Sequence, residues 1–192
     1  MWFIYCFKIL EKLGFWRFLT FFWIKIGTTR PLSEAETEAA RMVFSEGQLH
    51  FDKIRIHQNS PLCRLSGGRP LASFHIIHYP NSAQSMAVLI HELAHVAQFE
   101  AIGARYAPEA LLAQFHLGHA AYDFEKKGQL IEQAARGHRF ADLNREAQAQ
   151  LVEAYFIELT ERKNEARLAE FAPFLAEMRA GCASCCRWAS RA

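Results

Sequence analysis

The chain has 192 residues, 51% of them hydrophobic and 22% charged, and its formal net charge is +2. This length and balance suit a globular protein with one domain and a real core, and the small net charge predicts no nucleic-acid partner. The five cysteines are odd in number and three stand near the C-terminus, which does not fit a secreted disulfide framework. We therefore expect reduced thiols when the chain is made.

Residues 1–27 form an aromatic and charged segment that we expect to be an amphipathic helix. Positions 2–26 hold three of the four Trp, six of the sixteen Phe and five charges. The charges disfavour a transmembrane helix, in which each would cost about 2.5–3.5 kcal/mol, and no signal-peptide cleavage site is evident. The pattern indicates a helix lying in a membrane interface. The alternative is a helix packed on the domain or on a partner protein.

The next stretch predicts one helix and two strands. Ser33 and Glu36 have the spacing of a capping box, which predicts a helix that begins at Ser33 and ends near Gly47. Alternating polar and apolar residues predict a strand at 53–57, and SFHIIHY predicts a second at 73–79. The glycines at positions 67 and 68 mark a turn between the two strands.

Residues 85–100, SMAVLIHELAHVAQFE, contain an HExxH motif. In a helix, His91 and His95 lie one turn apart on one face, so their imidazoles can share one Zn²⁺ ion. Glu92 stands beside them and can take a proton from water that the metal activates. Apolar residues surround the motif, which predicts a buried helix, where these polar side chains need a metal or a hydrogen-bond network. We favour the metal.

Two further helices are expected after the motif. One occupies residues 108–121. The other is a long final helix capped by Asp142 or Asn144 and running to about Glu170, with Pro173 interrupting it.

The C-terminal tail, 173–192, contains a C-x-x-C-C sequence at Cys182, Cys185 and Cys186. A metal site, a redox pair and lipidation are the functional interpretations. A single C-x-x-C without a second pair is a weak zinc signal, so a flexible tail with incidental thiols is the simplest interpretation.

A catalytic zinc site has three protein ligands and one open position, and HExxH supplies two of the three. The metzincin pattern does not complete the set, because Gln98 and Ala101 stand where that pattern has glycine and histidine. We predict that Glu146, early in the final helix, is the third ligand. Glu153 is the alternative, two turns further along the same face and about 10 Å away.

The block at 146–150 is similar to the E-x-x-A/S-D pattern of glutamate-zincins, in which the residue four after the glutamate supports a zinc-bound histidine. Here that residue is Gln150, which accepts a hydrogen bond but adds no charge. The segments KIRIH, HELAHVAQ, AYDFE and NREAQAQLVEAYF also resemble a group of bacterial HExxH metallopeptidases related to Vgr proteins and contractile injection systems. This resemblance runs from about Leu32 to Phe156.

The resemblance implies a minimal zincin-like domain over residues 32–172. Its fold would be α+β and mostly helical, with a small sheet beside the HExxH helix and a long C-terminal helix. The resemblance also supports Glu146 as a ligand and implies an association with type VI or similar secretion systems. It implies no particular substrate.

The motif predicts a zinc metallopeptidase that hydrolyses peptide bonds of a peptide or protein substrate. Zn²⁺ is the cofactor and Glu92 the general base. Tyr122 is the first candidate for a second oxyanion donor, followed by His119 and His78.

Two alternatives stay open. One is a non-enzymatic, zinc-stabilised module that docks to a membrane surface through residues 2–26 or to a secretion apparatus. The other is a secreted toxin effector with an immunity partner. The sequence also leaves the compartment open: cytoplasmic, membrane-associated, or exported by a non-Sec route.

Overall fold

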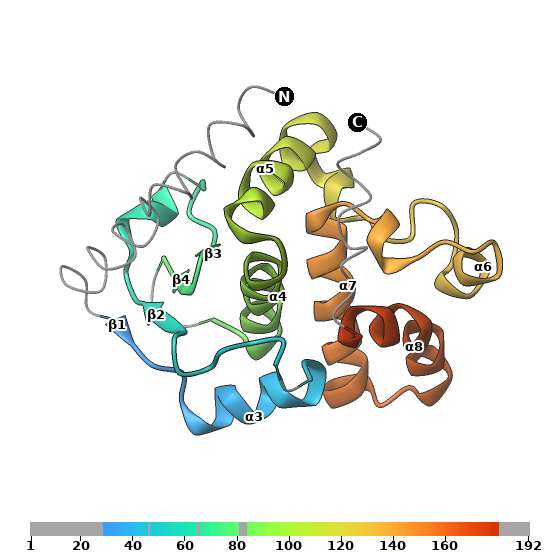
Figure 1. The fold of residues 1–192 in the computed structure, drawn as a ribbon, viewed down its shortest axis with the longest axis horizontal. Coiled ribbons are helices and arrows are strands. Elements are labelled where there is room, and N and C mark those ends of the chain that lie inside the picture. Colours follow the sequence, from blue (N-terminus) through green and yellow to red (C-terminus); the bar gives the residue numbers. More distant parts are fainter. Residues whose placement is uncertain (1–28, 46, 65, 81–83, 181–192) are drawn as a thin grey trace. The chain divides into compact units, whose positions relative to one another are not determined.

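The structure is a computed structural model that describes residues 29–45, 47–64, 66–80 and 84–180 (Figure 1). The aromatic segment 1–27, with its expected membrane contact, and the three C-terminal cysteines lie outside these residues. Contacts between Cα atoms divide the chain into two compact units, residues 1–108 and 109–192, and each is described by itself.

The described part of the first unit begins with the short strand β1 (Thr29–Arg30), and helix α3 (Glu34–Val43) follows it. The Ser33 side chain accepts a hydrogen bond from the Glu36 amide at 3.2 Å, and the Glu36 carboxylate accepts one from the Ser33 amide at 2.7 Å. Arg30 donates to both oxygens of the same carboxylate, at 2.6 and 2.7 Å. The predicted capping box is therefore confirmed, and an ion pair fastens it to β1.

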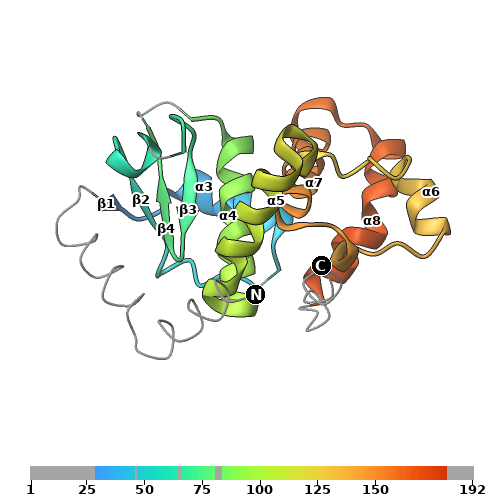
Figure 2. The same ribbon diagram turned by 90° about the horizontal axis from the view of Figure 1, so that it is seen from above.

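The sheet has four strands in the order β1-β2-β4-β3, seen side by side in Figure 2. The strands after β1 are β2 (Arg55–His57), β3 (Leu71–Ser73) and β4 (Ile76–His78). Strands β2 and β4 run parallel, whereas the other two pairs are antiparallel. The prediction of a small sheet is confirmed, and the sheet is mixed.

The single strand predicted at 73–79 is wrong, because the chain turns within it. Phe74 has a φ of 58°, a conformation that is uncommon for a non-glycine residue and that reverses the chain here between β3 and β4. Its ring lies 5.0 Å from that of Phe99, edge to face, and its amide donates to the Tyr106 hydroxyl at 3.2 Å. Burial of the Phe74 ring thus overrides the strand pattern and makes β3 and β4 a hairpin.

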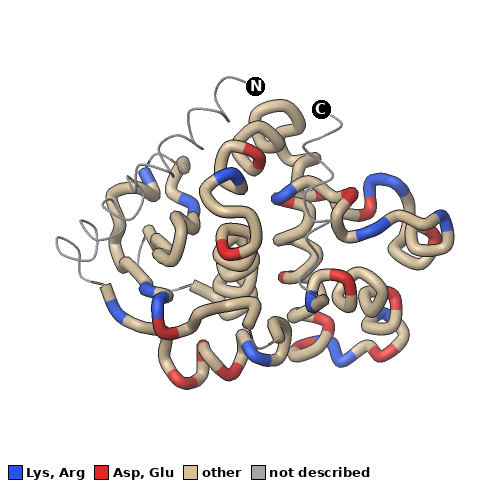
Figure 3. Tube along the Cα trace, in the orientation of Figure 1, with Lys and Arg blue, Asp and Glu red and all other residues tan. Residues whose placement is uncertain are grey.

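Helix α4 (Met86–Ile102) carries the HExxH motif and packs on α3, β3 and β4. Ser85 caps its start by accepting from the Val88 amide, and Gly103, with a φ of 69°, ends it. Its charged residues are Glu92 and Glu100, and Figure 3 shows how few Lys, Arg, Asp and Glu positions it contains. The predicted small sheet beside a buried HExxH helix is confirmed.

The second unit is helical over its described residues. Helix α5 (Tyr106–Leu117) leads into it and is followed by the 3₁₀ segment η3 (Gly118–Tyr122) and helix α6 (Leu130–Ala135). Helix α7 (Arg145–Ile157) packs on η3 and α8 (Glu165–Arg179), and α8 also packs on α6. The mostly helical α+β class that the sequence predicted is confirmed.

The long final helix is two helices. Asn144 caps α7, which then passes into the π-helical turn η5 (Glu158–Arg162). The break comes at Lys163, whose φ is 52°, and the side chain of Asn164 then caps α8. The predicted interruption at Pro173 is wrong, since α8 continues to Arg179. Four buried apolar side chains hold this helix in place across the proline: Phe171, Phe174, Leu175 and Met178.

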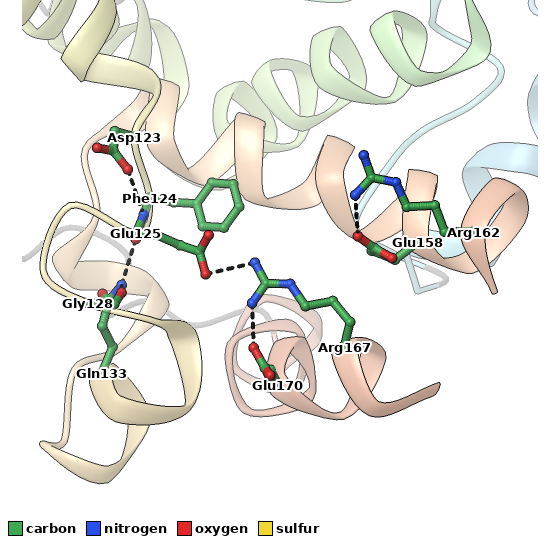
Figure 4. Close-up of polar contacts among 9 residues, drawn as sticks. All are labelled: Asp123, Phe124, Glu125, Gly128, Gln133, Glu158, Arg162, Arg167 and Glu170. Atoms are coloured by element: carbon green, nitrogen blue, oxygen red, sulfur yellow. Dashed lines mark hydrogen bonds and ion pairs between the residues drawn. The ribbon is translucent and has the colours of Figure 1, made fainter. Parts of the chain in front are cut away.

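Polar contacts attach the loop at residues 123–128 to helices α6 and α8 of the second unit (Figure 4). Arg167 of α8 donates to Glu125 at 2.7 Å and to Glu170. The buried amide of Gln133 donates to the carbonyl oxygens of Phe124 and Gly128, at 2.8 and 2.7 Å. None of the helices in the described part of the chain combines the length and the apolar character that a membrane span requires.

Candidate metal site

The structure groups the three residues that the sequence predicts as ligands. One ligand atom each from His91, His95 and Glu146 lies within 4.8 Å of the other two, and all three side chains are buried. The ring centroids of His91 and His95 are 5.1 Å apart, as expected for residues one turn apart on α4. Glu146 lies in the first turn of α7.

The chemistry of this group fits zinc. Two imidazole nitrogens and one carboxylate oxygen are the donor set of a catalytic zinc site, which leaves a fourth position for a reacting molecule. Burial of a carboxylate costs free energy unless hydrogen bonds or a cation offset the loss of hydration. A divalent cation held by these three side chains would offset that cost.

Gln98 contacts one of the two histidines directly. Its Oε1 lies 2.9 Å from Nδ1 of His95, and both side chains are buried, at 8% and 7% exposure. Gln98 stands one helical turn after His95, in the position where the metzincin pattern has glycine. In the sequence, Gln98 served only to exclude that pattern and this contact was missed, although the spacing of three residues on a helix could have indicated it.

Aromatic side chains fix the surroundings of His95. The ring of Tyr106 lies 6.2 Å from that of His95, and 6.1 Å from that of Phe99. The buried Tyr106 hydroxyl donates to the carbonyl oxygen of Ala72 in β3 at 2.9 Å and accepts from the Phe74 amide. Tyr106 therefore ties the β3–β4 hairpin to the helix that carries the two histidines.

Glu92, the predicted general base, is also buried on α4. Its charge acts on two neighbours in the first unit. Burial raises the pKa of the Tyr79 phenol, and the Glu92 carboxylate raises it further. The pKa of the buried Cys63 thiol is raised by the same two causes.

Buried contacts fix the start of α7, where Glu146 lies. Asn144 accepts hydrogen bonds from the amides of Glu146 and Ala147, each at 3.0 Å. The next residue, Arg145, donates to Glu109 at 2.8 Å, and both side chains of this ion pair are only 1% exposed. Gln148 accepts from Arg145 at 3.1 Å and donates to the Phe140 carbonyl oxygen at 3.0 Å.

The other predicted site residues are placed as follows. Glu153 and Gln150 are half-buried on α7, and the ligand group contains Glu146 and not Glu153. Tyr122 is half-buried at the end of η3, which packs on α7, and His119 is exposed. The roles predicted for these four residues stay predictions.

His78 is fully buried in β4, and two serines engage its ring nitrogens. Ser60 Oγ lies 2.8 Å from Nδ1, and Ser73 Oγ lies 2.7 Å from Nε2. Burial, together with the nearby His57, lowers the pKa of His78 to about 3. Both ring nitrogens already contact serine hydroxyls, so His78 is a poor candidate for an oxyanion donor.

A carboxylate near the end of α4 holds two more histidines. Glu100 contacts Nδ1 of His50, accepts from the His50 amide at 2.9 Å, and lies 3.1 Å from Nε2 of His75. Burial alone would raise the pKa of Glu100, but these contacts outweigh it and lower the pKa to about 2. The cluster joins the loop after α3 and the hairpin turn to the helix of the HExxH motif.

Comparisons with known proteins add no identification. No protein-family model matches the chain. The comparison with curated proteins found no match, and neither did the comparison with solved structures. The candidate function therefore depends on the chemistry of the site.

Proposed function

We propose that the protein is a zinc-dependent peptidase of the glutamate-zincin type. The observation that carries this proposal is the buried grouping of His91, His95 and Glu146 within 4.8 Å, with Glu92 on the same helix. Among the residues that the structure describes, this group holds three potential ligands, and three rather than four favour a catalytic site over a purely structural one, because a structural zinc is enclosed by four.

When bound, zinc would polarise the carbonyl of the peptide bond and lower the pKa of water at the site to about 7. Glu92 would take the proton from the attacking water and pass it to the leaving amine. His91, His95 and Glu146 hold the cation in place. Tyr122 is the first candidate to donate a hydrogen bond to the developing oxyanion.

The surroundings of the ligands support this assignment. A catalytic site requires ligands that keep their orientation, and hydrogen bonds from neighbouring groups supply that. His95 contacts Gln98 and Tyr106, and the start of α7 is held by Asn144 and the buried Arg145–Glu109 pair. These contacts restrict the orientation of His95 within the first unit and the position of the start of α7 within the second.

A link to a type VI or similar secretion system is a further part of the proposal, supported only by the resemblance of the HELAHVAQ and NREAQAQLVEAYF segments. With such a link, the partners of the protein besides its substrate would be a secretion apparatus or an immunity protein. Residues 2–26 would supply contact with a membrane surface.

The test is a comparison of wild type with Glu92→Gln, with zinc content and cleavage of an unfolded, fluorescently labelled casein measured on the same samples. The substitution keeps the shape of the side chain and removes the base. We expect zinc content to be unchanged and the cleavage rate to fall about 10²–10⁴-fold.

The matched control is Glu161→Gln, an exposed glutamate in η5, which should cleave at the wild-type rate. A Glu92→Gln protein that cleaves casein as fast as wild type would end the proposed mechanism. Loss of zinc together with activity would instead give Glu92 a role in metal binding.

A further inference from the structure

The Gln98 amide oxygen faces Nδ1 of the His95 imidazole. Which of the two groups donates the hydrogen bond decides which His95 nitrogen can bind a metal ion. An imidazole nitrogen that faces a carbonyl oxygen at 2.9 Å must carry a proton, because two acceptors would repel each other. With Nδ1 protonated, the neutral ring keeps its lone pair on Nε2. Nε2 is then the nitrogen of His95 that can bind a cation.

We propose that Gln98 is a positioning residue that selects the Nδ1–H tautomer of His95 and thereby presents Nε2 to the metal. The inference rests on the proposed zinc site. Gln98 lies on the HExxH helix itself, whereas Gln150, the residue predicted from the sequence to support a zinc-bound histidine, lies on α7.

Burial makes this contact effective. Gln98 and His95 are both more than nine-tenths buried, so water does not compete strongly for the bond, and the low polarity of the interior strengthens it. The ring of Tyr106, tilted by 33° at 6.2 Å, also restricts rotation of the His95 ring. An amide oxygen and an aromatic ring together fix both the tautomer and the orientation of the ligand.

A purely structural bond would have different consequences. If Gln98 only satisfied a buried histidine, its loss would lower the stability of the fold and leave zinc affinity unchanged. If it positions a ligand, its loss weakens zinc binding by about 10–100-fold, the usual cost of removing a hydrogen-bond partner from a metal-bound histidine. A carboxylate at the same position would make Nε2 a stronger donor and keep the bond.

The experiment measures the zinc dissociation constant of the full-length chain by competition with a chelator for wild type, Gln98→Leu and Gln98→Glu. We expect Gln98→Leu to bind zinc 10–100-fold more weakly, and Gln98→Glu to bind at least as tightly as wild type. The matched control is Gln133→Leu, which removes another buried glutamine, one whose side-chain amide donates to the loop carbonyls of Phe124 and Gly128. It should destabilise the fold and leave zinc affinity within about twofold of wild type.

The outcomes separate this inference from the proposed function. Wild type that binds no zinc overturns both. Wild type that binds zinc, with Gln98→Leu binding equally well or Gln133→Leu equally impaired, overturns the role of Gln98 alone.

If Gln98→Leu does not fold, a second measurement on wild type still tests the role of Gln98. Nitrogen-15 NMR of the zinc-loaded wild type should show the His95 ring protonated on Nδ1. A ring protonated on Nε2 would contradict the inference.

Discussion

His78 is a buried histidine with a strongly lowered pKa, and that makes its contribution to stability sensitive to pH. Its ring nitrogens contact Ser60 and Ser73, and its pKa is lowered to about 3 from an ordinary value of 6.5. Between these two pH values the unfolded chain binds a proton at this residue and the folded chain does not. Stability contributed by His78 is therefore complete above about pH 6.5 and is lost as the pH falls towards 3.

The lowered pKa of His78 predicts how the free energy of unfolding changes with pH. Wild type should lose stability between pH 7 and 5 more steeply than His78→Gln, in which the buried side chain no longer titrates. Urea unfolding of the zinc-free proteins at several pH values measures the two slopes. His119→Gln, a change at an exposed histidine, should follow wild type. Equal slopes for wild type and His78→Gln would contradict the predicted cause.

At the residue scale, the sequence predicts what spacing determines and misses what depends on distant contacts. His91, Glu92 and His95 are recognisable because four residues make one helical turn. The absence of the metzincin extension pointed to a later glutamate, and the similarity of residues 146–150 to the glutamate-zincin pattern favoured Glu146, which the structure groups with the histidines. The partners of His78 come from residues 60 and 73, whose proximity depends on the parallel pairing of β2 with β4 and on the hairpin.

At the scale of elements, the start of α7 depends on a buried ion pair. Arg145 and Glu109 are 2.8 Å apart and are almost completely shielded from water. Removing one charge of such a pair leaves the other buried without its counter-charge in the pair, which costs about 3–5 kcal/mol. We therefore expect Glu109→Leu to lower the free energy of unfolding by about that amount, whereas the double variant with Arg145→Met should recover a large part of it.

Urea unfolding of the two single variants and the double variant measures the coupling. The exposed pair Arg136–Glu132, at 3.8 Å, provides the control, and Glu132→Gln should cost no more than about 1 kcal/mol. A Glu109→Leu protein as stable as wild type would show that the pair does not hold the start of α7.

The elements themselves were predictable where local chemistry decides. The capping box of α3, the Ser85 start and Gly103 end of α4, and the Asn144 cap are all local signals, and each is observed. The hairpin turn at Phe74 and the passage of α8 through Pro173 were not predictable, because burial of Phe74 and of the apolar face of α8 overrides local preference. The short strands β1 and β3 carry too few residues to show a period.

At the scale of the whole molecule, the class of fold was predictable from the sequence, and the substrate was not. The small sheet beside the HExxH helix was implied by the resemblance, and the apolar residues around the motif predicted the burial of that helix. The substrate depends on side chains around the reacting bond. Its identity therefore has to come from cleavage measurements.

The measurement that tests the central claim most directly is the zinc content of the purified, folded chain, determined for wild type, Glu146→Ala and Glu153→Ala after dialysis against metal-free buffer. The account predicts about one zinc ion per chain in wild type and in Glu153→Ala, and a large loss in Glu146→Ala. Folded wild type without zinc, or zinc lost from Glu153→Ala and kept by Glu146→Ala, would contradict it.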